Sequence, residues 1–187
     1  MINKHNKKKT MAESFVNAQS RACGVVTTNS EGAIGVTTNI ITGISTVGIA
    51  SGYLVENSNY IYGTRVDRVD VSKVYCNRDS TNTAAASDQS VKFLGLTSTY
   101  TAASKSILIG GTFANNTESA VNIWIELHDS SSNTITGIGQ KIPVPTGSSF
   151  VLTDAGKTVL ETSDSVRIYC DTANGIDATL SILKGVS

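Results

Sequence analysis

The sequence predicts an all-β protein made of two small β domains, the C-terminal one an antiparallel Ig-like or jelly-roll-like sandwich, preceded by an N-terminal arm. Residues that favour strands (Val, Ile, Thr and Tyr) are abundant, and 16 glycines interrupt them. Helical periodicity longer than two turns is almost absent after the first twenty positions. A chain of 187 residues can bury one large core or two small ones, and the spacing of the turn residues favours two.

Residues 1–22 are expected to form a basic arm. The chain begins with a cluster of basic residues and continues with a polar sequence over 12–22 that is mildly compatible with a helix. The cluster consists of Lys4, His5, Lys7, Lys8 and Lys9. A solvated tail is the usual state of such a charge run. The alternatives are contact with phosphates and docking into an acidic groove of a neighbouring protein. A signal peptide is not expected, since no apolar run follows the basic residues.

Residues 23–93 are predicted to form the first β domain. Short apolar runs such as Val47–Ile49, Tyr53–Val55 and Tyr60–Tyr62 are separated by Gly, Asn and Ser, as in short strands joined by turns. One break in the alternation of valines within 65–74 predicts a bend or bulge. The polar segment 77–90 is predicted to be an exposed loop or linker.

Residues 94–187 are predicted to form the sandwich, with seven or eight strands at the roughly 8–12-residue spacing of that fold. The clearest strand lies within 120–129, where every second residue is apolar. Its predicted core face is Val121, Ile123, Ile125 and Leu127, and its outward face is Asn122, Trp124, Glu126 and His128. The only prolines, Pro143 and Pro145, predict an edge strand or a crossover, because proline cannot donate to a ladder.

Charge and cysteine content exclude several function classes. Fifteen basic residues balance fifteen acidic ones, so no overall field attracts nucleic acid, and no apolar run is long enough to span a membrane. Neither a nucleic acid nor a membrane is therefore expected as a partner. Cys23, Cys76 and Cys170 are isolated, without a CxxC pair, which predicts buried thiols in a reducing compartment such as the cytoplasm where the chain is made.

The sequence gives no catalytic pattern, so we expect neither an enzyme nor a bound cofactor or metal. His128 beside Asp129 could orient a base, but adjacent strand residues point to opposite faces. Paired carboxylates could act on glycosides, but none of the candidates lies in apolar text that would raise its pKa. These candidates are Glu126, Glu161, Asp164, Asp171 and Asp177, and turn formation accounts for the three Asp residues.

The C-terminal text PTGSSFVLTDAGKTVLETSDSVRIYCDTANGIDATLSIL, residues 145–183, resembles a β-sandwich module of tailed-bacteriophage structural proteins. The residues that carry the resemblance are Pro145, Gly147, Leu160-Glu161, Asp164-Ser165-Val166, Asp177 and Ser181. Ser163 stands where the family usually has Gly. The text TTNIITGISTVGIASGYLV, residues 37–55, is similar to repeated text in virion proteins of T4-like (cyanophage-type) phages.

This resemblance implies a virion structural protein, with head decoration as the first expectation and a neck or tail-associated position as the alternative. The implied partners are other virion proteins (major capsid, neck or tail proteins), and a homo-oligomer is expected. The expected interface residues are Lys4, Lys7, Lys8, Lys9 and Trp124. A carbohydrate-binding module is a further alternative, in which Trp124 and the tyrosines 53, 60, 62 and 100 stack on sugar rings.

Overall fold

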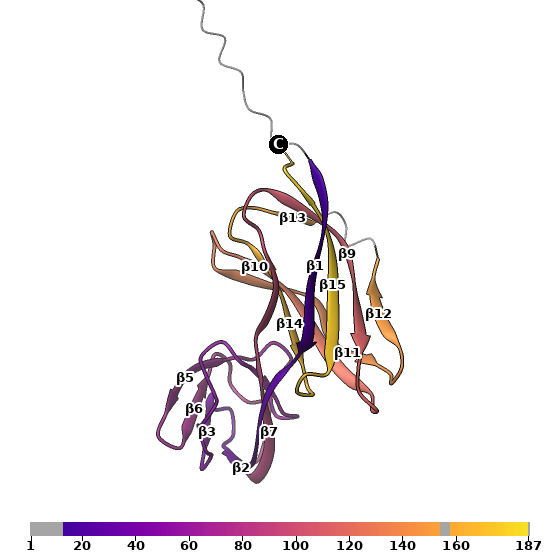
Figure 1. Cartoon of the computed structure of the whole chain (residues 1–187). Coiled ribbons are helices and arrows are strands. Elements are labelled where there is room, and N and C mark those ends of the chain that lie inside the picture. Colours follow the sequence, from indigo (N-terminus) through magenta and orange to yellow (C-terminus); the bar gives the residue numbers. More distant parts are fainter. Residues whose placement is uncertain (1–12, 154–157, 187) are drawn as a thin grey trace, which may run out of the picture.

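The computed structural model describes residues 13–153 and 158–186, and every regular element within them is a β-strand. Two antiparallel sheets face each other as a sandwich, and a third antiparallel sheet forms a second unit at one end of it (Figure 1). The predicted all-β fold with an antiparallel sandwich is confirmed. No helix among the described residues is long and apolar enough to cross a membrane.

The sandwich is built from one strand near the N-terminus and eight strands of the second half of the chain. One sheet has the order β1-β15-β9-β12, with β13 also paired to β9, and the other has the order β11-β10-β14-β8. The strands are β1 (Ser14–Cys23), β8 (Thr97–Thr101), β9 (Ser106–Asn115), β10 (Val121–Asp129), β11 (Thr134–Val144), β12 (Ser149–Leu152), β13 (Thr158–Leu160), β14 (Ser165–Cys170) and β15 (Ile176–Lys184).

The sandwich core lies between the two sheets and uses alternate residues of each strand. Val121, Ile123 and Ile125 of β10 are buried there, and Leu180 and Ile182 of β15 meet them from the facing sheet. Burying such a side chain contributes roughly 1.5–3 kcal/mol. The predicted core face of β10 is therefore confirmed. Its neighbour β11 is an edge strand and carries Pro143 near its end, as the proline predicted.

The expected arm over residues 1–22 is wrong in its second part, because residues 14–22 belong to strand β1. Seven consecutive residue pairs, from Ser14↔Lys184 to Ser20↔Ala178, join β1 to β15. The inward positions of β1 are small or moderately apolar (Val16, Ala18, Ser20), so the alternation lacks the large apolar residues that mark a strand in sequence. The four lysines of the predicted interface lie outside the described residues.

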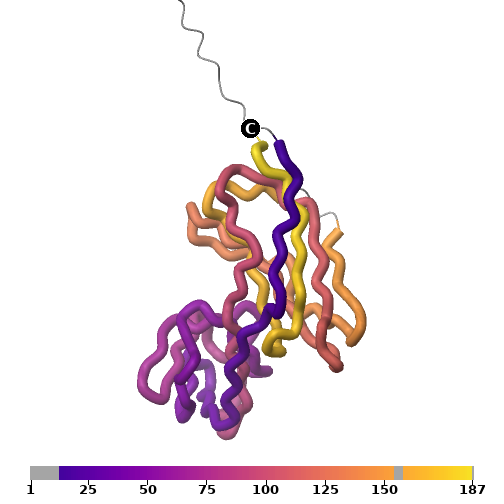
Figure 2. The backbone as a smooth tube through the Cα atoms, in the orientation of Figure 1, coloured from indigo at the N-terminus to yellow at the C-terminus, as the bar shows by residue number. Residues whose placement is uncertain are grey.

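The second unit is one six-stranded sheet inserted between β1 and β8 of the sandwich, with the order β4-β7-β2-β3-β6-β5. Figure 2 shows the chain leaving the sandwich at the end of β1 and returning through β7. Its strands are β2 (Val25–Ile34), β3 (Ile40–Thr42), β4 (Leu54–Glu56), β5 (Val66–Asp70), β6 (Lys73–Cys76) and β7 (Ala86–Gly95).

Local features of the second unit follow from its residues. Ile41, Val74, Val91 and Phe93 are fully buried in its own core. The bulge predicted within 65–74 appears as a register shift between β5 and β6 at Val66 to Arg68. The loop predicted over 77–90 is shorter than expected, because Ala86 already starts β7 and pairs with Ile34.

Gly24 makes the passage from β1 to β2 sterically feasible. Its φ of 127° lies in the region that L-residues with side chains rarely adopt. A Cβ at this position would collide with the carbonyl oxygen of Thr172, in the turn before β15. The close approach of these two segments fixes where the second unit leaves the sandwich.

All three cysteines are buried and unpaired, as expected from the sequence. Burial raises the pKa of Cys23 and Cys170 to about 11 and that of Cys76 to about 12. Desolvation disfavours the thiolate, and no group around Cys76 offsets it fully. The native thiols are therefore protonated and shielded at neutral pH.

We predict that iodoacetamide at pH 8 labels none of the three cysteines in the native protein and all three in denaturant. A pKa raised from 9 to 11 lowers the thiolate fraction by about a hundredfold, and the thiolate is the nucleophile. Mass spectrometry of the intact protein counts the labels. Thr112→Cys places a thiol at an exposed position of β9 and serves as the control that must react at once. Rapid labelling of a native cysteine would contradict the burial.

Candidate binding site at the junction of the two units

The outward face of β10 and β14 is covered by the second unit, which corrects the expectation that Trp124 forms an exposed interface. Trp124 is only 2% exposed and lies directly opposite Tyr169 across the two strands. Leu54 and Leu94, themselves paired between β4 and β7, pack against them. Trp124 does point away from the sandwich core, but another part of the same chain occupies that side.

A buried ion pair joins the two units beside this apolar contact. Arg65 precedes β5 in the second unit, and its Nη2 contacts Oε2 of Glu126 on β10 of the sandwich. Its Nη1 donates to the hydroxyl of Tyr169 at 2.9 Å and to the carbonyl of Gly52 at 3.2 Å. The Arg65 and Glu126 side chains are 12% and 2% exposed, so neither charge is solvated by bulk water. Each charge therefore depends on its protein partners.

The electrostatics keep this cluster in one protonation state. Burial alone would lower the pKa of the Arg65 guanidinium, but Tyr169 and Glu126 outweigh burial and the net change is upward. Burial raises the pKa of the Tyr169 hydroxyl, although the Arg65 charge opposes it. The guanidinium therefore stays charged and the phenol stays neutral throughout the physiological range.

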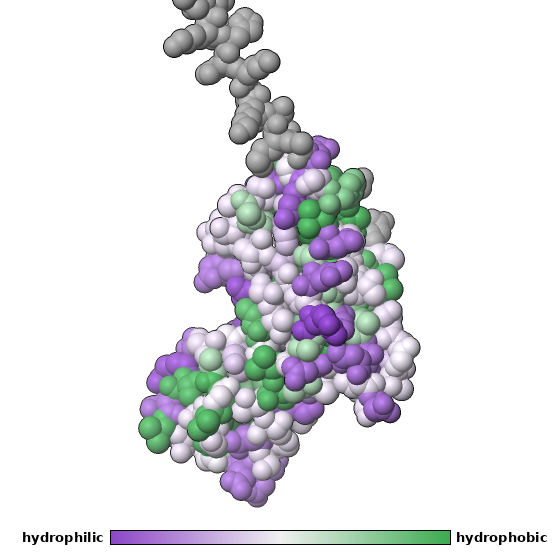
Figure 3. All heavy atoms as spheres, viewed as in Figure 1, coloured by the Kyte–Doolittle hydropathy of each residue, from purple (hydrophilic) through white to green (hydrophobic). Residues whose placement is uncertain are grey.

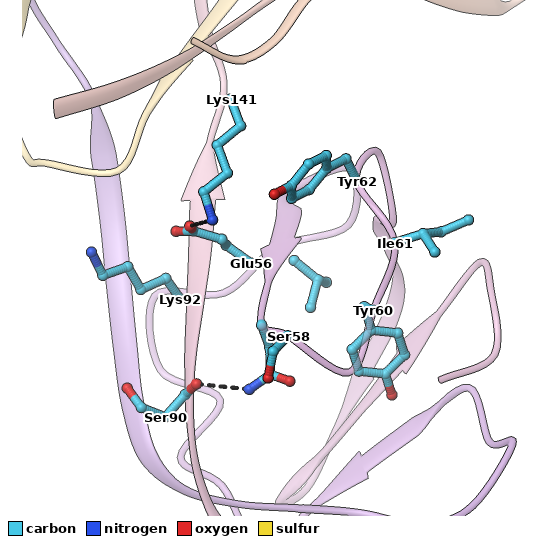
Figure 4. A pocket seen from close by; sticks show the side chains of 10 residues that line it. Glu56, Ser58, Tyr60, Ile61, Tyr62, Ser90, Lys92 and Lys141 are labelled. Carbon is cyan, nitrogen blue, oxygen red and sulfur yellow. Dashed lines mark hydrogen bonds and ion pairs between the residues drawn. The ribbon is translucent and has the colours of Figure 1, made fainter. Parts of the chain in front are cut away.

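A cavity of about 640 Å³ opens at the same junction and is the strongest candidate binding site (Figure 4). Most of its wall comes from β4, the loop after β4 and β7, and Lys141 of β11 completes it from the sandwich. The lining residues are Val55, Glu56, Asn57, Ser58, Tyr60, Ile61, Tyr62, Ser90, Lys92 and Lys141. Clefts between units of a protein are preferred places for small ligands.

The polar groups of this cavity hold one another in place. Lys141 Nζ lies 2.9 Å from Oε1 of Glu56, which raises the pKa of that lysine, and it lies 5.3 Å from the centre of the Tyr62 ring. Asn57 donates to the carbonyl of Ser90 at 2.9 Å. The second lysine, Lys92, donates to the carbonyl of Asp171 in the sandwich at 3.3 Å. The cavity thus has one carboxylate–ammonium pair beside the Tyr62 ring, and its second ammonium group, that of Lys92, points away from this ring (Figure 4).

Tyr62 also borders a second, more polar hollow of about 510 Å³. Arg65, Arg78, Asn133 and Gln140 contribute to its wall, again from both units. Tyr62 is 58% exposed, whereas Tyr60 and Tyr100 are buried at 4% and 8%. Of the aromatic residues proposed to stack on sugars, Tyr62 is the one that combines wide exposure with a cavity wall.

The carboxylates considered for catalysis hold turns and strands together instead. Asp164 accepts from the backbone N–H groups of Ser130 and Glu161, both at 2.9 Å. Asp171 accepts from the backbone and side-chain nitrogens of Asn122, at 2.9 and 2.7 Å. Asp177 accepts from the backbone N–H of Ala22 at 2.7 Å. Asp164 shares the wall of a small hollow of about 220 Å³ with Asp129 and His128, but both of its oxygens already accept hydrogen bonds from the backbone N–H groups named above.

The remaining candidates lie on the surface. Glu161 pairs with Lys105 at 3.2 Å, with both side chains well exposed. His128 Nε2 is 3.1 Å from Oδ1 of Asn133. Hydrogen bonds from Ser131 and Ser132 lower the pKa of Asp129 to about 2, so that carboxylate holds the following turn and does not orient His128. No group of three potential metal ligands occurs among the described residues.

The chain matches no protein-family model, and no curated protein or solved structure is significantly similar to it.

Sequence reasoning missed the pairing of Arg65 with Glu126. Glu126 was placed correctly on the same strand face as Trp124, two positions away. The available signal was a large aromatic residue and a carboxylate side by side on a face assumed to meet solvent. A covering layer that supplies a cation would have satisfied both residues.

We predict that Arg65→Ala lowers the free energy of unfolding by about 3–5 kcal/mol, because it leaves the Glu126 carboxylate buried without its partner. Denaturant unfolding followed by tryptophan fluorescence measures the change at the junction itself, since Trp124 is the only tryptophan. The double variant Arg65→Met, Glu126→Leu is expected to lose less than Arg65→Ala.

Lys105→Ala is the matched control, because it removes the exposed pair with Glu161 and should cost about 0–1 kcal/mol. Equal losses for Arg65→Ala and Lys105→Ala would contradict a role for the buried pair in holding the units together.

Proposed function

We propose that this protein is a non-enzymatic structural component of a tailed-phage particle, located on the head as a decoration protein and partnered by other virion proteins. The resemblance of residues 145–183 to a phage β-sandwich module supports the proposal. The observation that carries the non-enzymatic part is the use of Glu126, Asp164, Asp171 and Asp177 to hold the fold. An assembling role requires a stable body with binding surfaces and no reacting groups.

The described surface fits such a role. Net charge is zero, and charged residues make up only 16% of the chain, so the surface is polar but weakly charged. The two units are joined by the buried Arg65–Glu126 pair and by the Trp124 contact, which favours a rigid body. Rigid partners lose less conformational entropy when they join a particle. The alternative position at the neck or tail uses the same properties.

We predict that mass spectrometry of purified, salt-washed phage particles detects this chain at many copies per particle. A replication protein of the same phage is the control that must be absent. Separation of heads from tails, followed by the same measurement, distinguishes head decoration from a neck or tail position. Absence of the chain from washed particles would refute the proposal.

A carbohydrate-binding role is the second candidate, and the junction cavity favours it. Tyr62 offers an aromatic face, and Glu56, Asn57 and Ser58 offer hydrogen-bonding groups elsewhere in the cavity wall. Sugars are bound by this combination of a ring for their apolar face and polar groups for their hydroxyls. Trp124 drops out of this candidate site because it is buried.

We predict that, if glycans bind in the junction cavity, Tyr62→Ala weakens binding on a glycan array by roughly two- to tenfold, the value of one aromatic contact of about 0.5–1.5 kcal/mol. Tyr75→Ala is the matched control, since Tyr75 lies on β6 and does not line the cavity. Equal binding by the wild type and both variants would exclude this role for Tyr62.

A further inference from the structure

Strand β1 leaves one long backbone edge without a described partner. It lies at the end of the order β1-β15-β9-β12 and pairs only with β15 among the described strands. An edge strand presents a row of backbone N–H and C=O groups that can pair with another chain. β1 has ten residues, and its register with β15 is unbroken from Ser14 to Ser20.

The other sheet edges carry features that oppose pairing over most of their length, whereas β1 is regular from Ser14 to Ser20 and has a register shift only near its end, between Ser20 and Cys23. The edge strands β4, β12 and β13 have only three or four residues, and β8 has five. β5 is short and carries Asp67, Arg68 and Asp70. β11 is long, but Pro143 and two register shifts interrupt it. Short length, charge, proline and bulges are the usual protections of an edge, and β1 has a single charged residue, Arg21.

The charges that flank β1 complement each other when the strand meets a second copy of itself. The outward residues of the strand region are Glu13, Phe15, Asn17, Gln19 and Arg21, all exposed. A two-fold axis through Asn17 sets Phe15 opposite Gln19 in the regular part of β1. It also brings Glu13 of each copy, just before the strand, toward Arg21 of the other, at the register shift near the end of the strand. Opposite charges directly across an antiparallel pair stabilise it. Figure 3 shows a mostly hydrophilic strip along β1, as expected of a surface whose attraction is polar.

An apolar row reaches this edge across the outer face of the sheet. Phe15 lies opposite Leu183, Leu183 opposite Ile107, and Ile107 opposite Val159, so the row spans β1, β15, β9 and β13. Phe15 is 77% exposed at the end of the row. Pairing of two β1 strands would shield part of its ring with the side chain of Gln19 from the second copy.

We infer that two copies of this chain join edge to edge through β1, in antiparallel register about Asn17, to form one continuous sheet across a symmetric dimer. A two-fold interface uses the same strand on both subunits, so one self-complementary edge is sufficient. The dimer itself is inferred from the β1 edge, and only its place in a phage particle rests on the proposed function. A failed dimer test would leave detection in phage particles unaffected, and the reverse also holds.

The sharpest test is a disulfide at the two-fold axis. Residues directly opposite in an antiparallel pair have Cα atoms about 4.5–5.5 Å apart, which a disulfide spans. Asn17→Cys in the full chain is expected to give a covalent dimer under mild oxidation. Thr112→Cys is the matched control, because it lies exposed on the same sheet two strands from the edge. The native cysteines do not interfere, since they are buried.

A charge-reversal cycle tests the register. Glu13→Arg or Arg21→Glu alone places like charges opposite each other and should raise the dimer dissociation constant several-fold at low salt, measured by analytical ultracentrifugation. The double variant restores the pairing and the wild-type constant. Glu118→Arg, an exposed change away from β1, is the control and should have no effect.

The inference is overturned if the full chain stays monomeric at all accessible concentrations, or if Asn17→Cys and Thr112→Cys crosslink equally. It is also overturned if the full chain is monomeric and removal of residues 1–12 produces the dimer, because those residues would then occupy the edge in place of a second copy.

Discussion

The rest of the structure depends on the buried contact between Arg65 and Glu126. Each of the two units has its own apolar core, so the units need a separate interaction to hold them together. The Arg65 guanidinium provides this interaction. It contacts the Glu126 carboxylate and the Tyr169 hydroxyl in the sandwich, and it also donates to a backbone carbonyl of its own unit. A desolvated ion pair tolerates little displacement, because either charge alone would be left in a poorly solvated site. The apolar contact around Trp124 adds buried area to the junction, and the ion pair fixes how the two units are oriented there.

This junction also produces the cavities. Lys141 and Lys92 each reach from one unit to an acceptor in the other, to Glu56 and to the Asp171 carbonyl. These polar contacts connect the units beside the cavity, while Trp124 and Tyr169 pack against the second unit through apolar contacts. The junction cavity, with a wall of mixed polar and apolar side chains, lies beside these contacts. The cavity is therefore bordered by some of the same residues that join the two units.

Much of the fold could be predicted from the sequence because strand signals are local. The alternation in β10 and the turn residues between the later strands identify the sandwich and its core face. The failures share one cause. Before Cys23 at its end, β1 has only Val16 and Ala18 as apolar inward residues, and its partner β15 lies more than 150 residues away. The covering of Trp124 and the partner of Glu126 likewise depend on contacts between distant segments, which periodicity along one strand does not reveal.

The inserted position of the second unit explains why β1 is both necessary and exposed. A chain that makes its first strand, leaves to build another sheet and then returns must place that first strand beside a late one, and β15 is its partner. The strand then stands at the edge of its sheet, since β15 is already paired with β9 on its other side. An edge in this place can be protected by charge or by a partner. The single Arg21 within β1, matched by Glu13 just before it, is weak protection for a monomer but a complementary pair for a dimer.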